Sequence, residues 1–242
     1  MGSIRLFLHN LFSSLSDKDK DVAVADIIHD ASPHPHFFLM VGLSVLMATF
    51  GLLLDNASII IGSMLIAPIL SPILSLSLGV VISNHHQIFR SFVTLTKSIF
   101  VGLCLSVVAT LFFAPQSDIY TAEILARAEP TLMYFSVAVI AGLAVSFARV
   151  KPDLSETLPG VAISVALIPP LAVCGIGLSH LDWALASSAL VLFVVNAVGI
   201  VFASMLMFSL MNLYGNRDVA EITLKKEEKM INRQNNKIRG TS

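Results

Sequence analysis

The sequence predicts an all-α integral membrane protein whose six transmembrane segments form two inverted repeats of three helices. Three observations carry this prediction. The 242 residues are 55% hydrophobic and 13% charged, with a mean hydropathy of +0.83, which is more apolar sequence than a soluble core needs. The apolar residues fall into six runs, each long enough for a span of about 20 residues. Finally, one spacing of Asp, Gly and Pro recurs in the second and fifth runs.

The residues before the first apolar run, 1–36, are mostly polar and contain no cleavable signal. We expect a soluble cytoplasmic segment here, and its IRLFLHNLF stretch is amphipathic enough to lie on a membrane surface. Ser16 fits the N-cap of a helix that follows. The SPHPH stretch is expected to end that helix before the membrane.

The six apolar runs form a predicted transmembrane domain of residues 37–210. The connections between runs are short except for residues 114–130, where a brief helix outside the bilayer is predicted. The runs cover residues 37–54, 57–82, 91–113, 131–148, 158–179 and 183–210.

The Lys and Arg residues indicate the orientation of this domain. With six spans both ends of the chain lie on the same side, and 13 of the 15 Lys and Arg residues fall there. The opposite side holds only Arg127, while Lys97 lies within a span. Because basic residues concentrate in cytoplasmic loops, we expect both termini in the cytoplasm. Residues 211–242 are then a basic, weakly structured cytoplasmic tail.

An internal repeat relates residues 37–113 to residues 131–210. A shift of 98 residues aligns an Asp, two Gly and one Pro in the pattern D-x6-G-x9-P-x6-G. Since each repeat contains three spans, the second enters the membrane from the opposite side. Inverted repeats with interrupted helices are typical of transporters with a site near the bilayer midplane. The aligned residues are Asp55, Gly62, Pro72 and Gly79 in the first repeat, and Asp153, Gly160, Pro170 and Gly177 in the second.

Two prolines in each repeat predict that its middle helix is broken. They are Pro68 and Pro72 in the first repeat, and Pro169 and Pro170 in the second. Ser71 and Pro72 fit the N-cap and first turn of a new half-helix. The free N–H groups of a half-helix attract an anion, and the free carbonyls of the preceding half attract a cation. The alternative is that these prolines only kink the helices.

Three further polar residues lie within the predicted spans. Ser63 offers a hydroxyl near the first break. Lys97 is a candidate because a charge inside a membrane is costly, although it lies roughly 10 Å from the cytoplasmic end of its span and can snorkel out. Asn196, near the centre of the last span, either bonds a neighbouring helix or faces a site.

The repeated Asp residues have two interpretations, and the repeated Gly residues have one. Asp55 and Asp153 precede the broken helices, where they cap helix ends or act as gates at the two mouths. The glycines are expected to allow close helix approach. They are Gly62, Gly79, Gly160 and Gly177.

The sequence contains no pattern of an enzyme or a metal protein. HDASPHPH has ligand-type side chains but a proline-broken geometry, so we expect neither a metal nor a cofactor. Neither a G-x-S-x-G motif nor a phosphate-binding glycine loop occurs. The basic tail lacks interleaved aromatic residues, which argues against nucleic-acid binding. We therefore expect a protein that is not an enzyme.

Two stretches closely resemble a known family: FFLMVGLSVLMATFGLLLDNASIIIGSMLIAPILSPILSLSLGV and LPGVAISVALIPPLAVCGIGL. They are similar to the prokaryotic hydrophobic membrane family catalogued as domain of unknown function 389, from about Asp30 to Phe208. Mild departures are the polar pair Asp55 and Asn56, and Ser63 where Ala is common. The resemblance implies the cytoplasmic (inner) membrane of a prokaryote and a compact domain centred on the two Pro motifs. It implies no activity.

Two classes of function remain open from the sequence. The first is a homo-oligomeric transporter or channel that passes a small ion or solute, with an anion favoured, at the two proline breaks. The second is a membrane scaffold or sensory module without transport, for which a dry, tightly packed interior around Pro72 and Pro170 is the expected sign.

Overall fold

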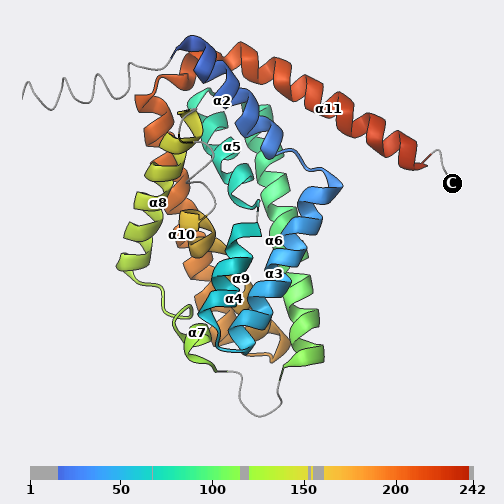
Figure 1. Ribbon diagram of the computed structural model, residues 1–242, viewed down its shortest axis with the longest axis vertical. Coiled ribbons are helices and arrows are strands. Elements are labelled where there is room, and N and C mark those ends of the chain that lie inside the picture. The colour runs from blue at the N-terminus through green and yellow to red at the C-terminus, as the bar shows by residue number, and fades with distance from the viewer. Residues whose placement is uncertain (1–15, 67, 115–119, 152–153, 155–160, 240–242) are drawn as a thin grey trace, which may run out of the picture.

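The computed structural model describes residues 16–66, 68–114, 120–151, 154 and 161–239, with the backbone alone for 161–166 and 234–239 (Figure 1). The described residues form helices and turns, without a strand. In chain order the helices are α2 (Asp17–Asp30), α3 (Pro35–Leu53), α4 (Ala57–Ile66), α5 (Leu70–Val81), α6 (His85–Phe113), α7 (Ala122–Leu125), α8 (Leu132–Val150), α9 (Val161–Ser179), α10 (Trp183–Leu210), the 3-10 helix η2 (Leu213–Asn216) and α11 (Arg217–Arg239).

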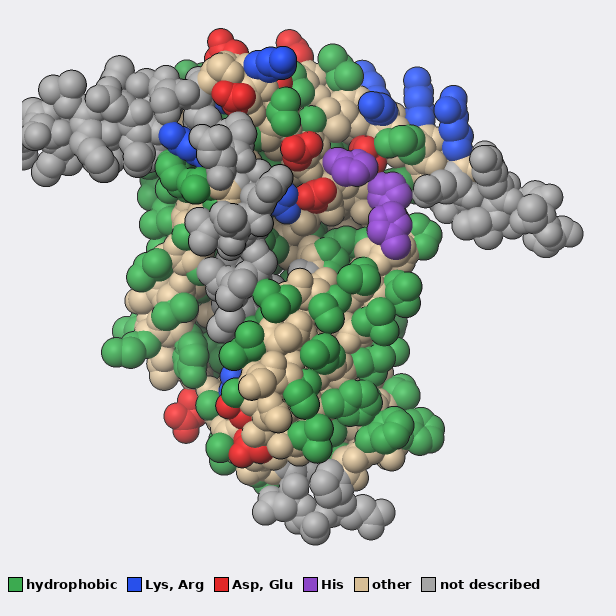
Figure 2. Space-filling model, in the orientation of Figure 1, with side chains coloured by type: hydrophobic (Ala, Val, Ile, Leu, Met, Phe, Trp, Pro, Cys, Tyr) green, Lys and Arg blue, Asp and Glu red, His purple; other side chains and the backbone are tan. Residues whose placement is uncertain are grey.

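The long helices run side by side along one axis of the molecule (Figure 1). Helices α2 and α11 cover one end, which we name the α2–α11 end, and α7 lies at the other, the α7 end. Helix α9 is central, because it contacts α3, α4, α6, α8 and α10. Figure 2 shows charged and His side chains gathered at the α2–α11 end, with hydrophobic side chains over most of the length below it.

Four helices are long and apolar enough to cross a membrane: α3, α6, α8 and α10. Helices α4 and α5 meet at a bend of 51° and count as a fifth span if they are taken together. The apolar stretch Leu167–Ser179 of α9 is shorter than a span. An all-helical, membrane-embedded protein is thus the correct fold class.

Three helix-to-helix connections use the same turn. In each, the backbone N–H of an Asn or Asp donates a 2.9 Å hydrogen bond to the carbonyl of a Gly five residues earlier. That Asn or Asp then caps the next helix. The residue before the cap has a φ of 50°, 53° or 57°. The three turns run from Gly51 to Asn56, Gly79 to Asn84, and Gly177 to Asp182.

Glycine is required in these turns because the second helix packs directly on it. A β-carbon at Gly177 would lie 2.8 Å from the backbone nitrogen of Ala186. A β-carbon at Gly79 would lie 3.1 Å from the nitrogen of Ile88, nine residues on as well. The two turns are 98 residues apart, which is the offset of the predicted repeat.

The first predicted break is present, but its position differs. Helix α4 ends at Ile66 and α5 begins at Leu70, so the interruption lies at Pro68. The residue that caps α5 is Ile69, without a side-chain hydrogen bond. The prediction of Ser71 as N-cap is therefore wrong. Pro72 lies in the first turn of α5, where backbone N–H groups have no intrahelical acceptor, so its missing N–H costs little.

The prediction that the second middle helix is broken at its prolines is wrong. Helix α9 is continuous, with Pro169 and Pro170 inside it. Each residue from 167 to 177 is buried. Packing on all sides holds this helix together, although an interior proline typically costs about 3 kcal/mol. Asp153 and Gly160 lie outside the described residues, as does the IRLFLHNLF stretch.

The C-terminal tail is more ordered than predicted. Its residues form η2 and the 23-residue helix α11, which packs on α2. Ala220, Leu224 and Glu227 are buried; their i, i+4, i+7 spacing places them on one face. The predicted N-cap Ser16 of α2 is confirmed, because its hydroxyl accepts a hydrogen bond from the N–H of Asp19.

Candidate functional site

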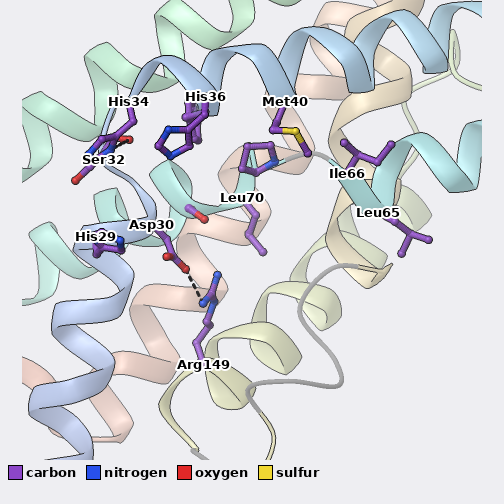
Figure 3. A pocket seen from close by; sticks show the side chains of 13 residues that line it. His29, Asp30, Ser32, His34, His36, Met40, Leu65, Ile66, Leu70 and Arg149 are labelled. Carbon is purple, nitrogen blue, oxygen red and sulfur yellow. Dashed lines mark hydrogen bonds and ion pairs between the residues drawn. The ribbon is translucent and has the colours of Figure 1, made fainter. Parts of the chain in front are cut away.

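A cavity of about 480 Å³ opens near the α2–α11 end, between α2, the start of α3, the α4–α5 break and Arg149 of α8 (Figure 3). We name it the vestibule. Its wall is polar on the α2 and α8 side and apolar near the break. The residues used below are His29, Asp30, Ser32, His34, His36, Pro68, Leu70, Ser71 and Arg149.

An ion pair joins α8 to α2 in the vestibule wall. Arg149 Nη1 lies 2.8 Å from Asp30 Oδ2, as the dashed line in Figure 3 marks. The two side chains are 21% and 37% exposed. The buried Nε of Arg149 has no hydrogen-bond partner among the described residues. The guanidinium charge of Arg149 is thus held beside the cavity by its pair with α2.

Three histidines also line the vestibule: His29 from α2, and His34 and His36 from the start of α3. The rings of His34 and His36 stack at 5.1 Å, and those of His29 and His34 are 6.1 Å apart. His29 Nδ1 lies 2.9 Å from Glu227 Oε1 of α11. The hydrogen bond to Glu227, the largest cause, raises the pKa of His29 above its usual 6.5. The vestibule therefore carries one histidine, His29, whose protonated form is stabilised by a carboxylate of α11.

The broken helix contributes the remaining polar group. Pro68 is half-buried and Ser71 is 7% exposed, and both line the vestibule. The first turn of α5 lines it too, through Leu70, so the positive end of that helix dipole lies at the cavity. Of the predicted site residues, Pro68 and Ser71 are the two that the vestibule brings together.

Other hydroxyls in the bundle pair with neighbouring helices instead. Ser63 donates to the carbonyl of Ile60, and its own carbonyl accepts a 2.6 Å hydrogen bond from Ser44. Thr49 donates to Ser106, which donates to the carbonyl of Ala172. None of these six residues lines the vestibule.

The remaining predicted site residues lie elsewhere. Pro72, Pro169 and Pro170 are buried, and Asn196 is buried in α10 at 2% exposure. Lys97 is exposed on the outer side of α6, in a shallow groove with Phe38 and other apolar neighbours. This position suits a side chain that snorkels toward the membrane surface.

Asp55 lies at the α7 end, where it accepts a hydrogen bond from the connection that contains α7 and leads to α8. It is exposed, and its carboxylate accepts a 2.9 Å hydrogen bond from the N–H of Glu123. Thr121 in the same connection donates to the carbonyl of Leu52, and Tyr120 donates to Asp182. The segment thus bridges the α3–α4 turn and the α9–α10 turn.

The sequence reasoning overlooked the charged residues of the vestibule. The sequence predicts no role for Arg149, and the histidines enter the prediction only as possible metal ligands. Among the described residues, no group of three or more His, Cys, Asp or Glu side chains is placed to hold a metal ion. A usable signal was the position of His34 and His36 directly before the first span.

Comparison with known proteins identifies relatives without an assigned activity. A family model described as domain of unknown function (DUF389) matches residues 64–202. An uncharacterized protein of the archaeon Methanocaldococcus jannaschii is 32% identical over 173 residues, which cover 71% of this chain and 52% of that protein. The chain therefore spans about half the length of this curated relative. No solved structure matches it.

Proposed function

This protein belongs to the domain of unknown function 389 family, and we propose that it is a membrane transporter or channel for a small ion or solute. The observation that carries the proposal is that the vestibule reaches Pro68, where the α4–α5 span is interrupted. Interrupted helices are tolerated at membrane depth where they line a cavity or pack on protein. Here the interruption, a helix N-terminus and an arginine meet at one cavity.

The path of the chain supports six crossings, which belong to the same proposal. Helices α3, α4–α5, α6, α8, α9 and α10 run in alternating directions between the two ends (Figure 1). The Gly79 turn lies at the α2–α11 end and the Gly177 turn at the α7 end. Identical turns 98 residues apart at opposite ends are expected of inverted repeats.

The charges support an orientation with the vestibule open to the cytoplasm. The described Lys and Arg residues lie mostly at the α2–α11 end, and Arg127 lies at the α7 end. By the positive-inside rule the α2–α11 end faces the cytoplasm of a prokaryotic cell. A solute thus enters the vestibule from inside, while the connection around Tyr120 covers the outer ends of two hairpins.

An anion remains the favoured solute. The vestibule contains the positive end of α5 and the guanidinium of Arg149, and protonated His29, whose pKa is raised by its hydrogen bond to Glu227, adds positive charge. Asp30 offsets part of this charge through its pair with Arg149. The preference for anions is therefore expected to strengthen below neutral pH.

Flux across liposomes tests the proposal. The purified full chain is reconstituted and assayed with a panel of small anions, cations and neutral solutes. Pro68→Ala is expected to lower flux several-fold because it favours a continuous helix across the break. Pro72→Ala is the matched control, since Pro72 lies in the first turn of α5 and its change is expected to be small. Folded protein without flux of any panel member would contradict transport.

A second function is favoured by the packing away from the vestibule. Pro72, Pro169 and Pro170 are buried, the hydroxyl of Ser63 donates within α4, and the hydroxyl of Ser106 donates to α9. A dry interior of this kind suits a scaffold or sensory module that transports nothing. Folded protein that lacks flux, but captures partners through the α2–α11 end, would support this alternative.

Homo-oligomer formation is part of the proposal. Helix α6 buries 28% of its most apolar window, less than the other three candidate spans, and Lys97 and Cys104 are exposed on it. A neighbouring copy at α6 would shield Lys97 from lipid, where a lysine costs about 2.5–3.5 kcal/mol. Thiol crosslinking through the native Cys104 tests this: a dimer lost in Cys104→Ser supports it, and uncrosslinked monomer contradicts it.

A further inference from the structure

Helix α11 is attached to the body of the protein through histidine–carboxylate contacts. Two consecutive acidic residues of α11 make them. Glu227 contacts His29 Nδ1 at 2.9 Å and His34 Nε2 at 3.9 Å. Glu228 contacts His86 Nε2 of α6 at 2.5 Å. Three histidines from three parts of the chain therefore meet one helix, and protonation of His29 adds an ionic attraction to its hydrogen bond with Glu227.

Burial makes Glu227 the critical member of this set. Its side chain is 3% exposed, whereas that of Glu228 is 44% exposed. A buried carboxylate is strongly disfavoured unless a cation or hydrogen-bond donors compensate it. Arg90 of α6 is a further cation in this region, and it donates a 2.8 Å hydrogen bond to Ser32. Loss of the His29 proton therefore weakens the attachment of α11, while the attraction between Arg90 and Glu227 remains.

We propose that α11 is a pH-dependent latch, which is docked on α2 and α6 through its contacts with His29, His34 and His86 and is released as His29 loses its proton. Every charged group that faces these histidines enters the balance. On α2 they are Asp26 and Asp30; on α11 they are Glu221, Lys225, Glu227 and Glu228; the other groups are His36, Arg90 and Arg149 of α8.

The direction of the pH effect follows from linkage. The docked state holds the His29 proton more tightly than the free side chain does, so its pKa is raised. Docking is therefore strongest below about pH 6.5 and is lost as pH rises through the raised pKa of the docked state. Within that window, the ratio of undocked to docked α11 rises up to about tenfold per pH unit for each coupled proton.

The latch also connects α11 to the vestibule. His29 and His34 both line this cavity and contact Glu227. Release of α11 therefore removes the contacts that hold His29 and His34 in the vestibule wall, near the Arg149–Asp30 pair. This consequence for transport rests on the proposed function, whereas docking of α11 does not.

A distance measurement on the full chain tests docking without any solute. Spin labels are placed at Val22→Cys of α2 and Lys229→Cys of α11, both exposed positions, in a Cys104→Ser background. We expect one short distance near pH 5.5 and a second, longer population that grows several-fold toward pH 8.5. An unchanged distance distribution over this range would overturn the latch, whatever the flux assay returns.

Two variants assign the effect to the proposed contacts. Glu227→Gln removes the buried carboxylate, so the growth of the long-distance population with pH is expected to shrink strongly. Glu221→Gln is the matched control: it removes a carboxylate of the same helix whose ion pair is with Arg217, and it is expected to keep most of the pH response. Equal pH responses in the two variants would overturn the assignment to Glu227.

Discussion

Tyr120 donates a 2.7 Å hydrogen bond to the carboxylate of Asp182, across 62 residues of sequence. Asp182 is also the N-cap of α10, where it accepts a hydrogen bond from the N–H of Leu185. One side chain thus joins a helix cap to the connection that covers the α7 end. A change at Tyr120 therefore measures how much this connection contributes to the stability of the protein, without altering the helices of the bundle.

Removal of the tyrosine hydroxyl is expected to destabilise the protein modestly. Tyr120→Phe should cost about 0.5–1 kcal/mol, the usual net value of one hydrogen bond, at the lower end because the contact is exposed. Thermal unfolding in detergent at neutral pH measures it. Tyr214→Phe is the control, since Tyr214 is exposed on η2. Equal shifts in unfolding temperature for the two variants would contradict the role of Tyr120.

The charge of Asp182 is expected to make stability depend on acid pH. Its pKa is lowered, first by the N–H of Leu185 and then by Tyr120. A lowered folded-state pKa means that this stabilisation is present above the unfolded value of 3.8 and is lost as pH falls through the folded value. Asp182→Asn should remove this acid dependence and keep the cap, as Asn84 does for α6. Unfolding temperatures between about pH 6 and pH 3 test this.

Glycine in the repeated turn is expected to be essential, unlike Gly62 of α4. Gly177→Ala should cost about 1–3 kcal/mol, because its β-carbon would meet the backbone of Ala186. Gly62→Ala should cost much less, since it meets only the flexible end of Met47 at 2.9 Å. Gly215→Ala, with nothing within 4 Å, is a surface control. Comparable losses of unfolding temperature for Gly177 and Gly62 would contradict this view of the turn.

Hydrophobicity and proline predicted the helices well because both act locally. The last apolar run, 183–210, coincides with α10, and Pro68 marks the interruption of the second run. The prediction of a broken helix failed at Pro169 and Pro170, where packing against neighbouring helices keeps α9 continuous. Pro170 reads as a break, yet a helix that is buried on every side is held by its neighbours. Helix α6 begins at His85, before the apolar run that starts at residue 91, because Asn84 caps it.

The vestibule was hidden because its residues are distant in sequence. Asp30 precedes the first apolar run and Arg149 follows the fourth, yet their side chains form one ion pair in the vestibule wall. Alternating Glu and Lys in the tail concealed the spacing of Ala220, Leu224 and Glu227, which gives α11 a face that packs on α2. Residues of the vestibule are brought together only by the folded structure, because no spacing in the sequence relates them. The spacing of the repeated turns, in contrast, is visible in the sequence.

A hydroxyl network between helices is expected to contribute to bundle stability. Ser106 accepts from Thr49 at 3.0 Å and donates to the carbonyl of Ala172 at 2.9 Å. Ser106→Ala should cost roughly 0.6 kcal/mol, the average for such bonds in a membrane. Ser106→Val should cost more, about 1–3 kcal/mol from overpacking, because Ser106 contacts the space beside Gly175. Unfolding temperatures of the two variants measure the difference; an Ala variant as unstable as Val would contradict it.

The Arg149–Asp30 pair is expected to set the charge preference of the vestibule. Asp30→Asn leaves the arginine unbalanced, so the preference for anions over cations should increase several-fold. Arg149→Gln leaves the aspartate unbalanced and should shift the preference toward cations. Each change should cost at most about 1 kcal/mol of stability, because the pair is partly exposed.

Reversal potentials in liposomes with an ion gradient measure these opposite shifts. Arg217→Gln is the control, since Arg217 forms a surface ion pair with Glu221 in α11 and does not line the vestibule. It should leave the reversal potential unchanged. Shifts in the same direction for the Asp30 and Arg149 variants would show that the solute does not sense the field of this pair. The permeation path would then have to bypass the vestibule.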